Sequence, residues 1–409
     1  MRLLLFLLFI STLGAEVPVA YQGRFRPLDV NAQEATLEML PDRFVVSHWH
    51  PLNELQDSKG NFTAYPDEIY QRLRAAYLQG DRQELHKTLE EAYASLEGKP
   101  YEEGSTNTLY FPTQGQLQAE SFYTRYPLIL GCIVLYSAAL LAFVLSAKRT
   151  ALVLMLSAFA LHTFILALRC YILGRPPVSN MQETIIYVPW ISVLASLLLR
   201  LIFKNSLVLA CACLLAVALL IILRTSGLNP ALENVQAVLN SQYWLTVHVL
   251  MVVGSYGIFL LSGILGHFYL IRNNEETAKL ILQTLYVGVA LLIPGTILGG
   301  VWAAQSWGRF WDWDPKEAWA FISICVYLIV IHAYTFHRIS YFGLAVGAIL
   351  GFQAILFTWY GVNYILGTGL HSYGFGNGGE IYYYIFAALD ICFLIGIWIL
   401  RKKRVAKNY

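Results

Sequence analysis

From residue 127 onward the chain consists of long apolar runs separated by short polar breaks. Nine of these runs are long enough to cross the ~30 Å hydrocarbon core of a bilayer as helices rising ~1.5 Å per residue. We expect these helices at residues 127–147, 150–172, 183–203, 206–223, 243–271, 280–301, 315–338, 341–362 and 380–400. The pattern therefore predicts an all-α polytopic membrane protein with about nine transmembrane helices.

The first 126 residues follow a different pattern. Residues 1–15 carry a basic start and a short apolar run, which is typical of a signal peptide. The run is too short to span a bilayer, and an uncleaved N-terminal anchor is the alternative interpretation. Residues 16–126 are polar, with helical patterns at 67–78 and 82–96 and turn-forming residues around 100–120. We expect a small α-rich external domain here.

Composition and charge fit this division. The chain has 409 residues, of which 57% are hydrophobic and 13% charged, whereas soluble proteins are about 25% charged. The net charge of +2 divides into −6 for residues 1–126 and +8 for the remainder. A nucleic-acid binder is excluded because 401–404 is the one clustered basic run. The sequence also contains no CxxC pair, GxSxG, Walker A or HExxH motif.

The basic residues also predict an orientation. Near the membrane, most lysines and arginines fall on one side of the predicted helices, and this side is expected to be cytoplasmic. They are Lys148, Arg149, Arg200, Lys204, Arg272, Lys279, Arg338 and the residues of 401–407. The C-terminus is then cytoplasmic and residues 16–126 lie outside, in the periplasm of a bacterium. We therefore predict the bacterial inner membrane rather than a thylakoid.

The loop after the sixth predicted helix is rich in tryptophan. Five tryptophans lie within 19 residues: Trp302, Trp307, Trp311, Trp313 and Trp319. An aromatic belt at the membrane interface would account for one or two of them at each helix end. It would not account for Gly308, or for Asp314 followed by Pro315, which is typical of a capped helix start. Such an aromatic loop suits a large, flat, apolar ligand.

Histidines on the same outer side could complete a ligand site. His248 lies near the outer start of the fifth predicted helix, and His371 lies in the outer loop 363–379. Two neutral imidazoles commonly hold a haem iron from both faces. For each histidine alone, an interfacial hydrogen bond is an equally good interpretation. His332 is different, because it lies about 25 Å into the seventh helix, toward the cytoplasmic end.

Other polar residues have simpler interpretations. His162 in the second helix is expected to be a buried structural histidine, and His267 and His337 are expected to cap or snorkel at helix ends. The two histidines at 48 and 50 form a possible ligand pair, although a surface loop is the favoured interpretation. Arg169 needs a partner in an apolar helix, and Glu183 is a candidate. Arg169 or Arg175 could instead bind an anionic ligand group such as a propionate.

These motifs resemble a family of haem-handling membrane proteins. The run from Trp307 to Glu317, WGRFWDWDPKE, resembles the tryptophan-rich WWD signature, and its surroundings resemble the CcsA (ResC) branch of system II cytochrome c biogenesis. The segments 174–183, 244–256 and 363–371 resemble that branch's outer loop and its two external histidine segments. His332 stands where the family has a membrane histidine. The resemblance covers about residues 127–400.

The resemblance implies a cytochrome c synthase (haem lyase) subunit whose substrate and bound cofactor is haem b. Haem would enter near His332 and reach the outer face, where His248 and His371 would be its axial ligands. The aromatic loop 302–319 would present the haem vinyl edge to the CxxCH thiols of apocytochrome c. Its haem-binding residues would be Trp302, Trp307, Gly308, Trp311, Trp313 and Asp314. No side chain would act as an acid, base or nucleophile.

The family pattern also implies a partner. In fused members, a second membrane histidine comes from a CcsB (ResB) portion that this chain does not match. A separate CcsB-type membrane protein could supply that ligand, or His162 could substitute. A haem transporter or chaperone of the CcmC/CcmF type, without ligase activity, is the first alternative function. A transporter of another solute is a more distant one.

Overall fold

The computed structural model describes residues 113–226, 241–367 and 380–407, together with shorter pieces of the front segment. Those pieces are six strands between residues 18 and 110 and single helical positions between 72 and 91. The chain forms two compact units, one of residues 1–128, 167–174 and 230–240, and a second of the rest.

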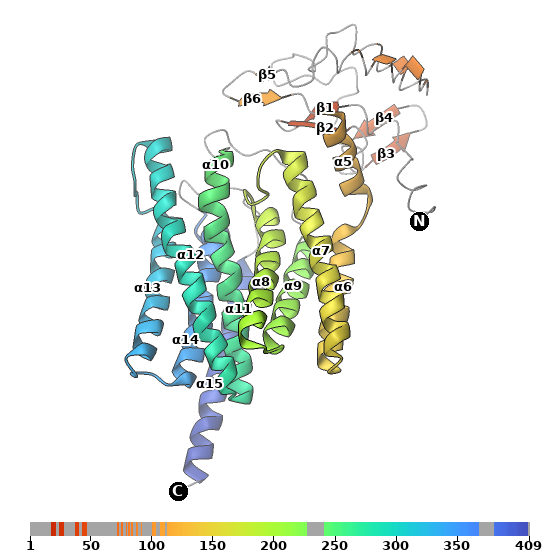
Figure 1. The fold of residues 1–409 in the computed structure, drawn as a ribbon. Helices are drawn as coiled ribbons and strands as arrows, with labels where there is room; N and C mark the ends of the chain where they lie inside the picture. The colour runs from red at the N-terminus through yellow and green to blue at the C-terminus, as the bar shows by residue number, and fades with distance from the viewer. Residues whose placement is uncertain are drawn as a thin grey trace. The chain divides into compact units, whose positions relative to one another are not determined.

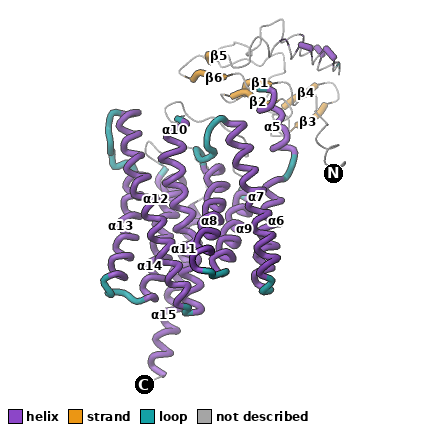
Figure 2. The backbone as a smooth tube through the Cα atoms, viewed as in Figure 1, coloured by secondary structure: helices purple, strands orange, loops and turns teal. Residues whose placement is uncertain are grey.

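The second unit is a helical bundle (Figures 1 and 2). Its first helices are α6 (Leu128–Val144), α7 (Lys148–Leu173, whose last turns belong to the first unit), α8 (Met181–Phe203) and α9 (Leu207–Thr225). A continuous span follows, made of α10 (Gln242–Trp244), η3 (Leu245–Val249) and α11 (Leu250–Arg272). The last helices are α12 (Glu275–Trp307), α13 (Pro315–Thr335), α14 (Tyr341–Leu356) with η4 (Phe357–Leu366), and α15 (Glu380–Lys407).

Helix α11 is the central element of this bundle, because it packs against α8, α9, α12 and α14. Small residues allow the close approach of these helices. Gly257 faces the backbone oxygen of Val188 on α8, and Gly266 faces that of Ala345 on α14; a β-carbon would come within 2.6 Å and 2.9 Å of these oxygens, respectively. Within the most apolar 18-residue stretch of the span Gln242–Arg272, 72% of the residues are buried. Small residues at helix contacts are typical of packing in a membrane.

Two π-helical segments interrupt the α-helices. The five residues of η3 precede α11, and the ten residues of η4 extend α14. The wider turn of a π-helix changes which side chains face a neighbouring helix, and such segments often occur at functional sites. The segment η3 carries His248, and η4 precedes His371 in the sequence, so both lie at segments predicted to hold iron ligands.

The expected fold class is confirmed. Within the described residues, eight helices are long and apolar enough to cross a membrane, or nine when α5 (Gln114–Arg125) and α6 count as one broken span. All nine predicted runs coincide with helices, including the short α9. The expected helix over 243–271 runs from Gln242 to Arg272, although it includes a π-helical turn. Residues 1–15 lie outside the described part.

The front segment contains strands that were not predicted from the sequence. Three antiparallel hairpins pair β1 (Pro18–Tyr21) with β2 (Arg24–Pro27), β3 (Leu37–Leu40) with β4 (Arg43–Val46), and β5 (Pro100–Glu103) with β6 (Asn107–Tyr110). Residues 100–120 were expected to be turns, yet they also include the start of α5. Thr113 and Gln116 form a reciprocal capping box there, which fixes this start. The segment is therefore mixed rather than only helical.

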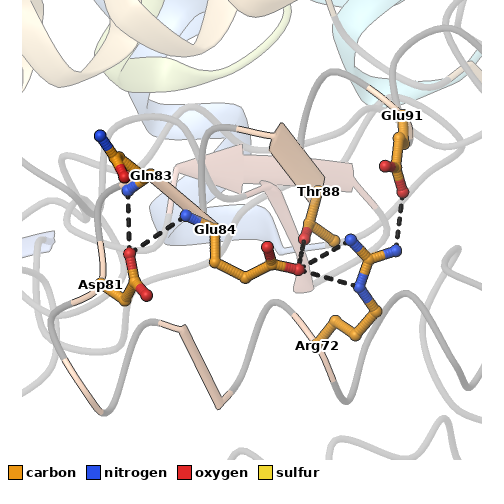
Figure 3. Close-up of polar contacts among 6 residues, drawn as sticks. All are labelled: Arg72, Asp81, Gln83, Glu84, Thr88 and Glu91. Carbon is orange, nitrogen blue, oxygen red and sulfur yellow. Dashed lines mark hydrogen bonds and ion pairs between the residues drawn. The ribbon is translucent and has the colours of Figure 1, made fainter.

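The two helical patterns expected at 67–78 and 82–96 do fall on helical positions. Asp81 ends the break between them, because its carboxylate accepts from the main-chain N–H groups of Gln83 and Glu84 (Figure 3). Arg72 then joins the two helical stretches through Glu84 at 2.8 Å and Glu91 at 2.7 Å. The hydrogen bond from Arg72 lowers the pKa of Glu84.

Candidate functional site

His248 lies on the π-helical segment η3 and faces α12. Its Nδ1 is 2.7 Å from the main-chain oxygen of Gly295. A carbonyl oxygen can only accept, so Nδ1 carries the hydrogen and Nε2 carries the lone pair. A neutral histidine held in this way by a backbone carbonyl is in the form that ligates a metal. The donor set therefore fits an axial ligand to a haem iron.

Gly299 allows this histidine to lie against the backbone of α12. A β-carbon at residue 299 would lie 2.5 Å from His248 Cε1, closer than any real contact of this kind. Gly299 was not identified from the sequence. The adjacent pair Gly299 and Gly300 on a predicted membrane helix was the available signal, because small residues mark close approach.

Two tryptophans extend the aromatic surface beside His248. The ring of Trp302 meets the imidazole edge-on, with centroids 5.8 Å apart, and Trp244 stacks near Trp302 at 6.5 Å. The indole N–H of Trp244 donates to Gln305 Oε1 at 3.0 Å, which ties the start of the span to α12. Trp302 therefore lies next to His248, and Trp244 is a further member of this aromatic surface that was not singled out from the sequence.

The tryptophan loop begins where α12 ends. Trp307 is the last helical residue, and Gly308 caps the helix with a φ of +73°, a conformation that glycine adopts without strain. Arg309 and Asp312 form an ion pair of 2.6 Å within the loop. Phe310 folds back, with its ring where a side chain on Gly300 would stand. Local contacts thus shape the first half of this loop.

The second half of the loop is fixed by the start of α13. Asp314 is buried and accepts from the main-chain N–H of Lys316 at 2.8 Å, and Pro315 is the first helical residue. Glu317 reaches back to the main-chain N–H groups of Asp312 and Asp314. The predicted cap is confirmed, and Asp314 has a structural role in the loop.

Trp311 and Trp313 have different surroundings within the same loop. Their rings meet edge-on with centroids 5.9 Å apart. Trp313 is 70% exposed and has a φ of +55°. The indole N–H of Trp311 is buried and has no acceptor within the described part of the chain. A buried donor without an acceptor is costly, so this N–H is suited to an acceptor on a ligand.

Lys316 joins the loop to the segment that precedes His371. Its Nζ donates to Asn363 Oδ1 at 2.8 Å and to the main-chain oxygen of Trp359 at 3.4 Å, both on η4. Trp359 in turn donates from its indole N–H to Thr184 on α8 at 3.0 Å. This connection was not predicted from the sequence. His371 itself, like the histidines at 48 and 50, lies outside the described residues.

The outer loop before α8 contains a buried ion pair. Arg175 and Glu183 are 3.0 Å apart, with side-chain exposures of 4% and 0%. Glu183 also accepts from the main-chain N–H and the hydroxyl of Ser179, at 2.8 Å each. Arg169 donates to the hydroxyl of Tyr123 at 2.8 Å. Glu183 is therefore paired with Arg175, whereas the sequence had suggested it as a partner for Arg169.

His332 lies in an open groove between α12 and α13. The groove has a volume of about 630 Å³ and is lined mainly by apolar residues, among them Tyr286, Ile293, Pro294 and Phe336. His332 is exposed, and its Nδ1 is 2.7 Å from the main-chain oxygen of Leu328. As with His248, the carbonyl fixes the hydrogen on Nδ1 and leaves the lone pair on Nε2.

His162 is enclosed, in contrast with His332. Its side chain is fully buried, with Nε2 2.9 Å from the main-chain oxygen of Ile186 and Nδ1 3.4 Å from the hydroxyl of Tyr136. Both ring nitrogens are therefore engaged with protein groups. This arrangement matches the expected structural histidine and disfavours His162 as a replacement iron ligand.

Comparison with known proteins gives the class to which this helical bundle and tryptophan loop belong. Residues 178–371, which include η3, the tryptophan loop and η4, match the family model described as cytochrome C assembly protein. The helical membrane part of the chain thus matches the cytochrome c assembly class over this segment.

Individual relatives narrow this class. The chain is 30% identical over 289 residues to the cytochrome c biogenesis protein CcsA of Synechococcus sp., covering 60% of this chain and 94% of that protein. CcsA of Chlamydomonas reinhardtii is 30% identical over 229 residues, 50% of this chain and 62% of its own length. The chain belongs to the CcsA family of cytochrome c biogenesis proteins, as the motifs had suggested.

A longer relative matches as well. Protein NrfI of Wolinella succinogenes is 35% identical over 316 residues, which are 70% of this chain. The chain spans about a third of the length of NrfI, since the match covers 34% of that protein.

Proposed function

We propose that this chain delivers haem across the membrane and positions it on the outer face for covalent attachment to apocytochrome c. The observation that carries the proposal is the setting of His248. A backbone carbonyl fixes its ligating tautomer, and Trp302 and Trp244 form an aromatic surface beside it. His371 would be the opposite axial ligand. A flat, apolar, iron-containing ring matches this combination of groups.

The attachment itself needs no side-chain acid or base from this chain. Each CxxCH thiol adds across one haem vinyl group, so that sulfur bonds to one vinyl carbon and hydrogen to the other. The addition has no net gain or loss of electrons. The chain would act by positioning: Trp307, Gly308, Trp311, Trp313 and Asp314 shape the loop that presents the vinyl edge. The chain would thus be a haem lyase subunit acting on haem b.

The groove at His332 supports an inner site that a partner completes. His332 is exposed in a groove that is open along one side. The alternative ligand, His162, is enclosed between other helices. We propose that a CcsB-type membrane protein covers the groove and supplies the second iron ligand. Such a partner would make the lyase a complex of two chains.

The division of the chain follows from this proposal. Residues 1–15 would be a signal peptide or anchor, residues 16–126 a periplasmic domain, and residues 127–409 the haem-handling domain, with loop 302–319 on the outer side. The membrane would be the bacterial inner membrane, with the C-terminus in the cytoplasm. Fusion of a reporter enzyme to each end would test this orientation.

Co-expression with a client distinguishes the proposed synthase from a transporter. The chain and a CcsB-type protein are expressed with a CxxCH apocytochrome in a host lacking its own attachment system. Covalent haem on the client, retained in a denaturing gel, is expected. Haem that copurifies with the chain while the client stays apo would indicate a CcmC/CcmF-type carrier. A chain that never carries haem would overturn both and leave a transporter of another solute.

A further inference from the structure

Three polar side chains meet between α11, α14 and α15, away from the residues proposed to bind haem. His267 Nε2 lies 3.2 Å from Asp390 Oδ1, and Gln353 donates a short hydrogen bond to the other carboxylate oxygen. His267 and Asp390 lie in helices that can span a membrane, as does Gln353. An ionisable group at such a position is energetically costly unless it is paired, and it often marks a functional site. From the sequence, only a capping or snorkelling role was expected for His267.

The geometry specifies how many protons the pair holds. His267 Nδ1 is 2.9 Å from the main-chain oxygen of Gly263, so it must carry a hydrogen to donate. On the other side, Nε2 and the carboxylate can form a hydrogen bond only if one proton lies between them. Either the imidazole donates to a carboxylate, or a carboxylic acid donates to the imidazole. Both arrangements bind one proton and leave the pair with no net charge.

Loss of this proton would leave a charged carboxylate, hydrogen-bonded to the Gln353 amide, facing a nitrogen lone pair of His267. Asp390 is 6% exposed, and the ring of Phe393 lies 4.8 Å from that of His267. In so apolar a setting an uncompensated negative charge is strongly disfavoured. The proton is therefore part of what makes the contact between α11 and α15 favourable.

The neighbouring titratable groups do not replace that proton. Tyr383 on α15 donates to the main-chain oxygen of Gln353 at 3.5 Å, and Cys392 on α15 is exposed. Tyr341 on α14 donates to Glu275 on α12 instead. Among the described residues, no lysine or arginine forms a hydrogen bond or ion pair with Asp390. The pair itself supplies the charges at this contact.

Helix α15 has little other packing to hold it. Within the most apolar 18-residue stretch of α15, 6% of the residues are buried. The corresponding share is 61% for the span made of α14 and η4. The helix is held by contacts with η4, by Arg401 over the ring of Phe342, by the edge-on rings of Phe352 and Phe386, and by this polar cluster. The cluster is therefore one of few contacts that seat it. A change in the charge of the cluster would then change the seating of the whole helix.

We propose that His267, Asp390 and Gln353 form an intramembrane proton-binding site, and that the bound proton seats α15 against α11 and α14. The site's ligand is a single proton, taken up when His267 and Asp390 come together and released when they part. This inference is independent of haem binding and goes beyond the proposed function. It makes the last span a proton-dependent element.

Infrared difference spectroscopy tests whether the site binds a proton. The full chain in lipid nanodiscs is titrated with alkali, and Asp390→Asn is measured in parallel. A carboxyl or imidazole signal that titrates in the wild type and disappears in Asp390→Asn is expected. The variant His162→Gln, which alters a buried histidine without an acidic partner, should keep the signal. A titration that is identical in wild type and Asp390→Asn would overturn the proposal.

Cross-linking tests whether the proton seats the helix. Cysteines at Phe352 and Phe386, in a background without the native cysteines, are joined by a short bifunctional thiol reagent across a pH series. A matched pair at Tyr334 and Tyr341, between α13 and α14, corrects for the pH dependence of the reagent. The corrected yield should fall severalfold as pH rises.

The same measurement on Asp390→Asn separates a proton site from a merely structural contact. The asparagine amide is neutral at every pH, and it can donate to His267 and accept from Gln353. We expect the corrected yield to stay high and to lose its pH dependence. A wild-type yield that does not change with pH, or a variant that responds as the wild type does, would contradict the seating.

Discussion

The surroundings of His248 and His332 differ although the two histidines themselves are alike. In both, a main-chain oxygen 2.7 Å from Nδ1 fixes the hydrogen there and leaves the lone pair on Nε2. Around His248, aromatic rings and a close glycine come from this chain. Around His332, the chain provides a groove that is open on one side. One carbonyl thus holds each imidazole in the form that can ligate a metal, whereas the two proposed haem sites differ in how much of their surface this chain supplies.

The largest expected effect tests this contrast directly. If this chain builds the outer haem site as proposed, His248→Ala should remove the haem that the chain holds when purified alone. His332→Ala should leave that haem in place but abolish the additional haem gained when a CcsB-type partner is present. Soret absorbance of the chain purified with and without the partner measures both. Equal losses of Soret absorbance in the two variants purified without the partner would contradict the difference between the two histidine sites.

Filling the space beside the outer histidine should have the next largest effect. Gly299→Ala would put a methyl group where His248 Cε1 lies. Overpacking of this kind costs about 1–3 kcal/mol, which corresponds to roughly fivefold to 150-fold weakening of haem at the proposed outer site. Haem titration of the purified variant measures it. Gly396→Ala on α15, where a β-carbon meets nothing within 4 Å, is the matched control and should bind as wild type does.

A variant of Lys316 tests whether contacts beyond the first iron ligand organise the proposed outer site. Lys316→Met keeps most of the volume but removes the hydrogen bonds to η4. A hydrogen bond to a charged group contributes about 1.5–3 kcal/mol, so haem at the proposed outer site should weaken by about tenfold or more while the proposed inner site is unaffected. Lys279→Met, at a 55% exposed side chain, is the control. Equal weakening at both sites would indicate a general loss of stability.

The smallest effect is expected for the buried indole N–H in the loop. Trp311→Phe keeps an aromatic ring but removes the donor that lacks an acceptor among the described residues. If a ligand supplies that acceptor, haem affinity should fall by about 1 kcal/mol, a factor of about five. Trp398→Phe, at an exposed ring on α15, should not change it. An unchanged affinity in Trp311→Phe would mean that the ligand does not use this donor.

Features set by hydrophobicity and local chemistry were predictable from the sequence. The nine apolar runs correspond to helices because a bilayer requires the backbone to be satisfied within each segment. The Asp314–Pro315 helix start was predictable because capping is a contact between near neighbours. The family's tryptophan run likewise stands in one continuous segment.

Features set by contacts between distant segments were not predictable. The π-helical turn at His248 packs against α12, and its composition gives no sign of the π conformation. The contact of Lys316 with Asn363 joins residues far apart in sequence, as does that of His267 with Asp390. The hairpins of the front segment were missed because four-residue strands give too short an alternation to recognise.

Helix α12 acts as a partition between the two histidine sites. Ile293 and Pro294 line the groove of His332, whereas Gly295 and Gly299 contact His248. Successive helical residues turn by about 100°, so Ile293 and Gly295 lie on nearly opposite faces. A ligand that moves from the groove to His248 must therefore pass around helix α12, or helix α12 must bend to let it through. Pro294, which cannot donate the usual helical hydrogen bond, provides the natural place for such a bend.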